Sequence, residues 1–299
     1  MVGSTIPRRA FGRFLRGLRE QAGATLLTAG LQIETSKQTV MRLEDGLATK
    51  VSTPQLKELL DLYKVGPQVR AEALELWEEV RQQAKAAKAQ GIAKGWWQAY
   101  ADQYAPHFNH YLRLEEVTNH LTTHQLVLVH GLVQTPKYRR AIIKETHPSM
   151  SAVNVERRLE LAARRQERLR DNDFRLDVML SEAVLRHQPG GPPAMIEQLR
   201  HLATIGESDN VSIRVIPHSV GMYRGLATLS FSLLEFPDLA RHLAEPPVVY
   251  TEGSEGALYL EQRDTITRFK DAISEIQRVA LSEKDSREFI SKIAKEYAT

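Results

Sequence analysis

The sequence predicts an α+β protein: an N-terminal all-α domain of four to five helices, then a larger mixed α/β domain with a small sheet and C-terminal helices. In the first part, apolar residues recur at helical spacing behind Ser, Thr and Pro residues that favour helix starts. From residue 96 onward, short runs of β-branched and aromatic residues alternate with charged helical patterns. A chain of 299 residues is long enough for two such domains.

Two short helices joined by a tight turn are predicted between Thr25 and Gly46. Thr25 is the expected N-cap of the first, from about Leu26 to Gln32, and Ser36 that of the second. A short helix with a polar outer face fits the major groove, where its N-terminal residues can meet base edges. The alternative is an αα-hairpin with no role in nucleic-acid binding. The inward positions are Ala29, Ile33, Val40 and Leu43, and the outward positions of the second helix are Lys37, Gln38, Met41 and Arg42.

Helical patterns flank this pair on both sides. Phe14–Gly23 predicts an earlier helix with Leu15 and Leu18 on its buried face. Ser52–Val65 predicts a later one that has Thr53 as N-cap and Pro54 at its first position.

In this order and spacing, the four patterns resemble the helix-turn-helix module of the lambdoid-phage-repressor or XRE class. Two positions depart from the family: Glu34 stands where the turn usually has glycine, and Leu26 stands where a phosphate-binding glutamine is common. The resemblance implies binding to double-stranded DNA, with base contacts from Lys37, Gln38, Met41 and Arg42, and an ion pair between Arg19 and Glu44. The expected phosphate contacts are Arg8, Arg9, Arg13, Arg16, Thr25 and Lys50.

The charge distribution agrees with this reading. Residues 1–50 carry eight Lys/Arg and four Asp/Glu, a balance of +4, whereas the whole chain has a net charge of +3, which leaves −1 for the remainder. Such asymmetry is typical when one domain meets phosphates. No run is apolar enough for a membrane span or a signal peptide, and there is no cysteine, so we expect a cytoplasmic protein without disulfides.

We expect the helix-turn-helix domain at residues 1–66, a helical connector at 67–95 and a mixed α/β domain at 96–299. The connector has an apolar stripe, then an Ala- and Lys-rich stretch, which favours a helix. In the last domain, helices are expected after Pro136 and at 151–170, 192–206, 263–281 and 283–297. The expected strands are 124–135, 174–182, 211–217, 228–236 and 247–252, with 256–260 closing a hairpin.

The second half carries a series of short motifs: GLVQT at 131–135, ERRLELAARRQERL at 156–169, MLSEAVLR at 179–186, VIPHSVG at 215–221, FSLLEF at 231–236, VVYTEG at 248–253 and LYLE at 258–261. With these motifs it resembles a conserved domain of uncharacterised function that follows such a helix-turn-helix in many actinobacterial regulators. The resemblance implies that residues 96–299 form a sensor or partner-binding domain, sometimes with a small companion protein in a pair of toxin–antitoxin type.

Candidate binding residues in this domain follow strands, because loops that leave buried strands often contact ligands. We expect an effector or partner site formed by His218, Gly221, Tyr223, Arg224, Tyr250 and Glu252. The basic run at 157–170 could be a second nucleic-acid surface, but its interleaved glutamates favour a solvated or inter-subunit helix face. The spacings of His107 with His110 and of His120 with His124 could suit zinc or iron, but no HExxH motif, cysteine or carboxylate at ligand spacing accompanies them. Neither phosphate-loop nor GxSxG motifs occur, so no metal, cofactor or enzyme activity is expected.

These observations predict a homodimeric, sequence-specific transcriptional regulator, such as a repressor, controlled through its C-terminal domain by a small-molecule effector or companion protein. The alternative is an antitoxin-like protein that sequesters a small companion protein and uses DNA binding to regulate its own gene. The sequence does not separate the two hypotheses.

Overall fold

The computed structural model describes residues 6–89, 96–237 and 245–298. The chain divides into two compact units, Met1–Gln98 with Pro237–Glu245, and Ala99–Phe236 with Pro246–Thr299. The first is helical and the second combines a six-stranded sheet with helices, so the predicted α+β class is confirmed. Among the described residues, no helix is long and apolar enough to cross a membrane.

The N-terminal unit holds its own apolar core. Phe11 and Leu15 pack with the buried side chains of the later helices, and the Phe11 ring lies 5.0 Å from that of Trp77. Trp77 belongs to the segment expected to be a connector, which packs on the first helix and so completes this core. The helices are α1 (Ile6–Gln21), α2 (Leu26–Gln32), α3 (Lys37–Glu44), α4 (Thr53–Leu62) and α5 (Pro67–Ala89).

Side-chain caps fix where these helices begin. The hydroxyls of Thr25 and Ser36 accept from the amides of Thr28 and Thr39, at the starts of α2 and α3. The expectation for α4 was wrong by one residue, because Ser52, not Thr53, is its N-cap. Ser52 forms a capping box with Gln55, in which each side chain accepts from the other's backbone amide.

The second unit contains one mixed sheet in the strand order β3-β2-β1-β4-β5-β6. The central strand, β1, pairs in parallel with β2 and antiparallel with β4. β2 and β3 are parallel, whereas the β4–β5 and β5–β6 pairs are antiparallel. The strands are β1 (His120–Gln125), β2 (Arg175–Ser181), β3 (Val211–Ile216), β4 (Phe231–Glu235), β5 (Val248–Gly253) and β6 (Gly256–Leu260).

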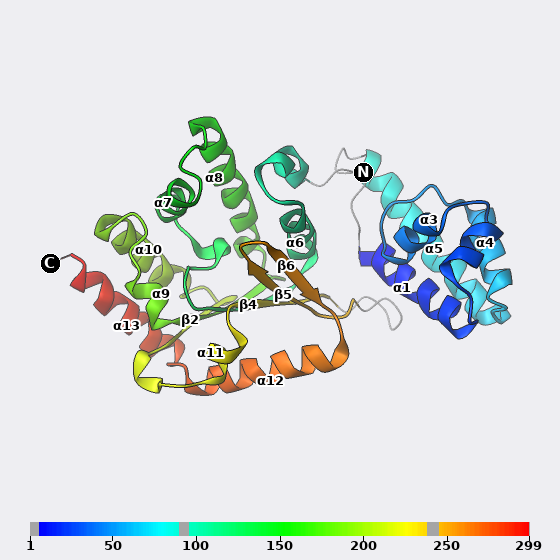
Figure 1. Ribbon diagram of the computed structural model, residues 1–299. Coiled ribbons are helices and arrows are strands. Elements are labelled where there is room, and N and C mark those ends of the chain that lie inside the picture. The colour runs from blue at the N-terminus through cyan, green and yellow to red at the C-terminus, as the bar shows by residue number, and fades with distance from the viewer. Residues whose placement is uncertain (1–5, 90–95, 238–244, 299) are drawn as a thin grey trace. The chain divides into compact units, whose positions relative to one another are not determined.

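Helices cover both faces of this sheet (Figure 1). Because side chains alternate along a strand, Val248 and Tyr250 join the larger core and Val249 joins the smaller one. The larger core includes side chains of α6 (Pro106–Val117), α7 (Pro136–Thr146), α9 (Glu182–Arg186), α10 (Pro192–Ile205) and α13 (Glu283–Glu296). The smaller core includes α12 (Arg263–Val279). The remaining elements are α8 (Ala152–Gln166), α11 (Arg224–Thr228) and the 3₁₀ turns η1 (Trp96–Gln103), η2 (Gly131–Val133), η3 (Glu167–Arg170) and η4 (His218–Val220).

The strand predicted at 124–135 was mostly wrong. Pairing begins earlier, at His120, and ends at Gln125, after which the chain forms a loop and η2. Val127 is 57% exposed in that loop, so its apolar run does not lie in the sheet. The buried Gln198 holds the end of the loop, because its Nε2 donates to Val133 O and its Oε1 accepts from Thr135 N, each at 2.7 Å.

Ion pairs of His120, on β1, link this strand to β2 and β4. Its Nε2 lies 2.8 Å from Asp177 Oδ2 on β2, and its Nδ1 lies 3.2 Å from Glu235 Oε2 on β4. The hydrogen bonds with Asp177 and then Glu235 outweigh burial and raise the pKa of His120 to about 9. The bond with His120 is also the main reason that the pKa of Glu235 falls to about 2.

We therefore predict that the stability of the second unit depends on pH through this cluster. The His120 contribution is fully present below its ordinary pKa of 6.5 and is lost as pH rises through about 9. The Glu235 contribution is present above its ordinary pKa of 4.5 and is lost as pH falls toward 2. Stability from the cluster is thus greatest between those two ordinary values.

Urea unfolding of the full chain from pH 5 to 9.5 tests the alkaline arm. His120→Gln should cost about 1–3 kcal/mol at pH 6, after allowance for solvent screening, and much less at pH 9.5. His187→Gln, at an exposed histidine, is the matched control. Equal losses for His120→Gln at both pH values would contradict the role of its charge.

Candidate nucleic-acid interface and ligand cavity

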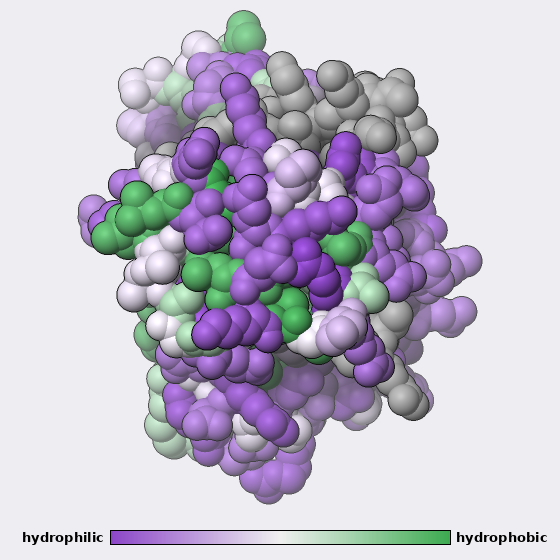
Figure 2. Space-filling view, turned by 90° about the vertical axis from the view of Figure 1, so that its right-hand side faces the viewer, coloured by the Kyte–Doolittle hydropathy of each residue, from purple (hydrophilic) through white to green (hydrophobic). Residues whose placement is uncertain are grey.

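The buried residues of α3 determine which of its other residues face outward. Val40 and Leu43 are almost fully buried in the core of the N-terminal unit. Lys37 and Gln38 are exposed on the opposite side, Met41 is 43% exposed, and Arg42 is partly buried. The expected base-contacting residues therefore share one accessible face. Figure 2, which looks onto this unit, shows hydrophilic side chains over most of the surface, with smaller apolar areas between them.

The turn between α2 and α3 adopts the left-handed conformation at Glu34, whose φ is 52°. This conformation costs a non-glycine residue about 1–2 kcal/mol. Thr35 N donates to Gly30 O at 2.8 Å and closes the turn. A Cβ on Gly30 would meet Thr35 O at 3.0 Å, so a glycine in α2 admits the close return of the chain. Glu34 thus adopts a conformation that glycine would adopt without this cost.

Glycines also let α1 and the end of α3 approach closely. A Cβ on Gly12 would lie 2.4 Å from Glu44 O, and one on Gly46 would lie 2.6 Å from the Cα of Arg9. Gly46 also has a positive φ of 66°, which favours glycine. The backbone of α1 is therefore in close contact with the backbone at the end of α3, at Gly12 and again at Gly46.

A buried ion pair fastens the same junction. Arg19 Nε donates to Glu44 Oε1 at 2.7 Å and Arg19 Nη2 donates to Glu44 Oε2 at 3.0 Å. The Glu44 side chain is 1% exposed and that of Arg19 is 11% exposed. The hydrogen bond to Glu44 raises the pKa of Arg19 despite partial burial. The pair named from the sequence is therefore a bidentate, largely desolvated contact between α1 and α3.

The residues expected to contact phosphates are in different environments. Thr25 and Lys50 are exposed, and burial lowers the pKa of Arg8. Arg16 lies 2.5 Å from Asp45 and 3.5 Å from Glu44. Arg9 and Arg13 each lie 2.8 Å from Glu245, whose side chain is 1% exposed. A phosphate would have to compete with these carboxylates for Arg9, Arg13 and Arg16.

The expected effector residues of the second unit fall into separate places. Tyr223 and Arg224 line a hollow of about 670 Å³ beside α12. Tyr250 and Glu252, on β5, line a different cavity of about 600 Å³ on the other face of the sheet. The remaining two residues line neither: His218 N donates to Glu182 Oε2 at 2.8 Å, and Gly221 has a positive φ of 69°. The structure therefore does not bring the six predicted residues together in one site.

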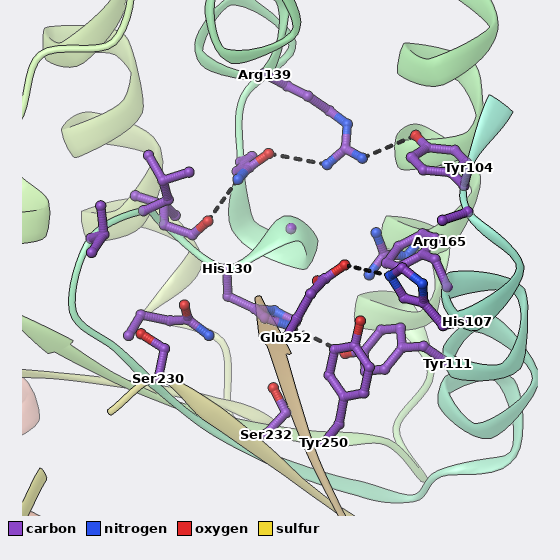
Figure 3. Close-up of a pocket in the computed structure, with 18 of the residues that line it drawn as sticks. Tyr104, His107, Tyr111, His130, Arg139, Arg165, Ser230, Ser232, Tyr250 and Glu252 are labelled. Atoms are coloured by element: carbon purple, nitrogen blue, oxygen red, sulfur yellow. Dashed lines mark hydrogen bonds and ion pairs between the residues drawn. The ribbon is translucent and has the colours of Figure 1, made fainter. Parts of the chain in front are cut away.

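The 600 Å³ cavity lies beyond the carboxyl end of β1, where this strand has a parallel neighbour on one side and an antiparallel neighbour on the other. Ligand sites in open α/β sheets commonly form at the carboxyl ends of strands, where the strand order changes direction. Its walls come from the short segment between η1 and α6, from α6, the loop after β1, η2, α7, α8, β4 and β5 (Figure 3). Three arginines line it: Arg139, Arg158 and Arg165.

Arg165 corrects one expectation about the basic run at 157–170. Its side chain is 4% exposed, and its Nε and Nη2 donate to the two carboxylate oxygens of Glu115 at 2.7 and 2.6 Å. Burial raises the pKa of Glu115, but the charge and hydrogen bonds of Arg165 outweigh it and leave the pKa below its ordinary value. The run is therefore not simply a solvated helix face, because one of its arginines is a core residue.

A neutral histidine lies beside this pair. Burial lowers the pKa of His130 to about 4. His130 Nδ1 accepts from Leu132 N at 3.4 Å, so Nε2 carries the hydrogen and faces the Tyr111 hydroxyl at 3.2 Å. The ring is thus fixed in one tautomer in the cavity wall.

Comparison with known families agrees with both halves of the chain. A family model described as a helix-turn-helix domain matches residues 10–73. A second, described as a domain of unknown function (DUF5753), matches residues 108–292, more than half of the chain. Both resemblances predicted from the sequence are confirmed. Neither the curated proteins nor the solved structures give a match.

The Arg19–Glu44 pair generates a prediction about the stability of the N-terminal unit. Glu44→Ala leaves a largely buried guanidinium without its carboxylate, and we expect a loss of about 3–5 kcal/mol. Asp45→Ala, which removes a 43% exposed carboxylate one residue on, should cost less than about 1 kcal/mol. The measurement is thermal unfolding of residues 1–90, which include the core of this unit. Equal losses for the two variants would show that burial of the pair adds nothing.

Proposed function

The chain belongs to the DUF5753 family and carries a helix-turn-helix domain ahead of it, and from this we propose that it is a sequence-specific, DNA-binding transcriptional regulator. The observation that carries the proposal is the face of α3, which presents Lys37, Gln38, Met41 and Arg42 above a buried apolar base. Lys and Arg suit guanine, Gln suits adenine, and the Met41 side chain suits a thymine methyl group. A role on chromosomal DNA implies a cytoplasmic location.

We propose that the protein acts as a homodimer. The accessible face of α3 spans only two turns of helix, so one copy reads few base pairs. Helix-turn-helix proteins usually gain specificity by binding two half-sites about one helical turn of DNA apart. A repressor that occupies a palindromic operator is the simplest form of this proposal.

The C-terminal unit is proposed as the controlling domain. Its cavity of about 600 Å³ is within the size range of small-molecule sites and is lined by polar and aromatic side chains. The proposal includes no catalytic step, because the sequence contains none of the catalytic motifs considered above.

One observation favours the alternative, in which a small companion protein is the main partner. Met222, Leu226 and Leu229 are 76%, 40% and 63% exposed within the segment around α11. Exposed apolar groups of this kind often mark protein-binding surfaces. Co-purification of the tagged chain with the product of an adjacent small gene, and its loss in Met222→Asp/Leu229→Asp, would support an antitoxin-like role.

The base-reading assignment gives a first prediction. Gln38→Ala and Arg42→Ala should each reduce discrimination among operator sequences by about 1–3 kcal/mol, because each removes a hydrogen-bonding group from a base edge. Nonspecific binding and the melting temperature should change little. Selection of bound sequences from a random pool, with Lys57→Ala on α4 as control, measures this. Wild-type sequence preference in both variants would refute the assignment.

The phosphate assignment gives a second prediction. Lys50→Ala should weaken binding to all DNA sequences alike and should reduce the slope of log K against log salt by about 0.9. Arg16→Ala should reduce the slope less, since Arg16 is already held by Asp45 and Glu44. Fluorescence anisotropy over a series of salt concentrations gives these slopes. If neither variant differs from Lys57→Ala, these side chains do not face the DNA.

A further inference from the structure

The cavity beyond β1 holds more positive than negative charge. The charge of Arg165 is neutralised by Glu115, which lies behind the wall of the cavity. Arg139 donates to Gln134 Oε1 at 3.0 Å and to the Tyr104 hydroxyl at 3.3 Å, both of which are neutral. Within the described ranges 6–89, 96–237 and 245–298, Arg139 has no carboxylate within ion-pair distance.

Arg158 is in the same situation. It donates to the carbonyl of Gln103 and lies 4.7 Å over the ring of Tyr104, again without a carboxylate in ion-pair distance among the described residues. The Nε atoms of Arg139 and Arg158 are buried and make no hydrogen bond in this part of the structure. Burial lowers the pKa of both arginines, and Arg139 further lowers that of Arg158. Two guanidinium groups therefore share a confined space without a counter-ion.

Among the described residues, one carboxylate lines the cavity, and it does not offset the two arginines. Glu252 is 46% exposed, and its Oε1 lies 3.4 Å from His107 Nε2. Figure 3 shows Glu252 beside His107, away from the Arg139 side chain. Glu252 therefore leaves the excess positive charge uncompensated.

A glycine keeps space open in front of the arginines. A Cβ on Gly131 would lie 3.1 Å from Arg165 Nη1 and 3.5 Å from Arg139 Nη1. A side chain at this position would therefore narrow the space in front of Arg139, which an anion bound to that guanidinium would occupy. Gly131 does not have a positive φ, so its backbone conformation does not require glycine.

Aromatic rings supply the apolar part of the cavity. Tyr104 lies 4.8 Å from Phe108, and Phe108 stacks on Tyr111 at 5.6 Å. Tyr250 lies 4.4 Å from Tyr111 on the side of the sheet. A flat ligand can contact these rings while its charged end reaches the arginines.

We propose that this cavity binds a small organic anion, which presents a phosphate or carboxylate group to Arg139 and Arg158 and an apolar ring to Tyr104, Phe108 and Tyr111. Guanidinium groups recognise both kinds of anion through paired hydrogen bonds. This inference identifies the effector class of the proposed regulator and so rests on the control function assigned to the C-terminal unit.

Calorimetric titration of the full chain with three probes tests the binding. Phenyl phosphate combines the ring with the anion, inorganic phosphate has the anion alone, and benzyl alcohol has the ring alone. We expect phenyl phosphate to bind more tightly than either of the others, with a Kd of about 1 mM or below, and benzoate to show whether a carboxylate substitutes for the phosphate. No detectable binding of phenyl phosphate or benzoate would overturn the proposal.

Variants locate the site. Arg139→Gln and Arg158→Gln should each weaken phenyl phosphate binding about tenfold or more, since each removes a charged donor. Arg140→Gln, at the next residue of α7, removes an exposed arginine paired with Glu156 and should bind like the wild type. Gly131→Ala keeps every charge and should weaken binding by filling the space. This variant therefore still tests the site if an arginine variant does not fold. Wild-type affinity in all three cavity variants would place the binding elsewhere.

DNA binding separates this inference from the proposed function. If phenyl phosphate or benzoate binds the cavity and changes the affinity for the operator, the anion-binding inference and the proposed control function are both supported. Binding without any effect on DNA would support the cavity and remove its control function. Specific DNA binding by a chain whose cavity binds neither anion would leave the regulator and overturn the inference.

Discussion

The buried ion pair between Arg165 and Glu115 is the constraint around which the second unit is arranged. Both side chains are almost fully buried, at 4% and 3% exposure, so either charge alone would be strongly unfavourable. The pair therefore requires α8 and α6 to meet in one register, with two parallel hydrogen bonds. The wall of the 600 Å³ cavity follows from that meeting, because Arg165 and its neighbours on both helices line it.

The sequence predicted the local structure of the N-terminal unit well, because local rules determine it. Thr25 and Ser36 are caps, and the four residues predicted to face inward are all buried. Ser52 was missed as a cap because Thr53, beside it, has a hydroxyl of the same kind. The choice between them depends on Gln55, whose side chain returns to Ser52.

The arginines of the cavity were harder to predict. Helical periodicity shows which residues share a face, but not which face another element will cover. A signal was nevertheless present: Arg165 follows the buried Leu161 and Ala162 by four and three residues, so it lies on the apolar face of α8. Glu115 follows the buried Tyr111 in the same way on α6. Opposite charges on two apolar faces are a pattern that could have suggested the pair. Tyr250 and Tyr223 were grouped in one site because strand order and sheet face are not visible in a single sequence.

The glycines at the junction of α1 and α3 have a consequence for how a regulatory signal could act. With Gly12 and Gly46 allowing backbone to touch backbone, and Arg19 tied to Glu44, no compressible layer of side chains separates the two helices there. Tilting α3 within its own unit would break these contacts together. In the dimer that we propose, a signal that releases DNA would meet less resistance if it moved each N-terminal unit as a rigid piece and changed the distance between the two copies on the operator. In such a dimer, the spacing of the half-sites would be the quantity under control.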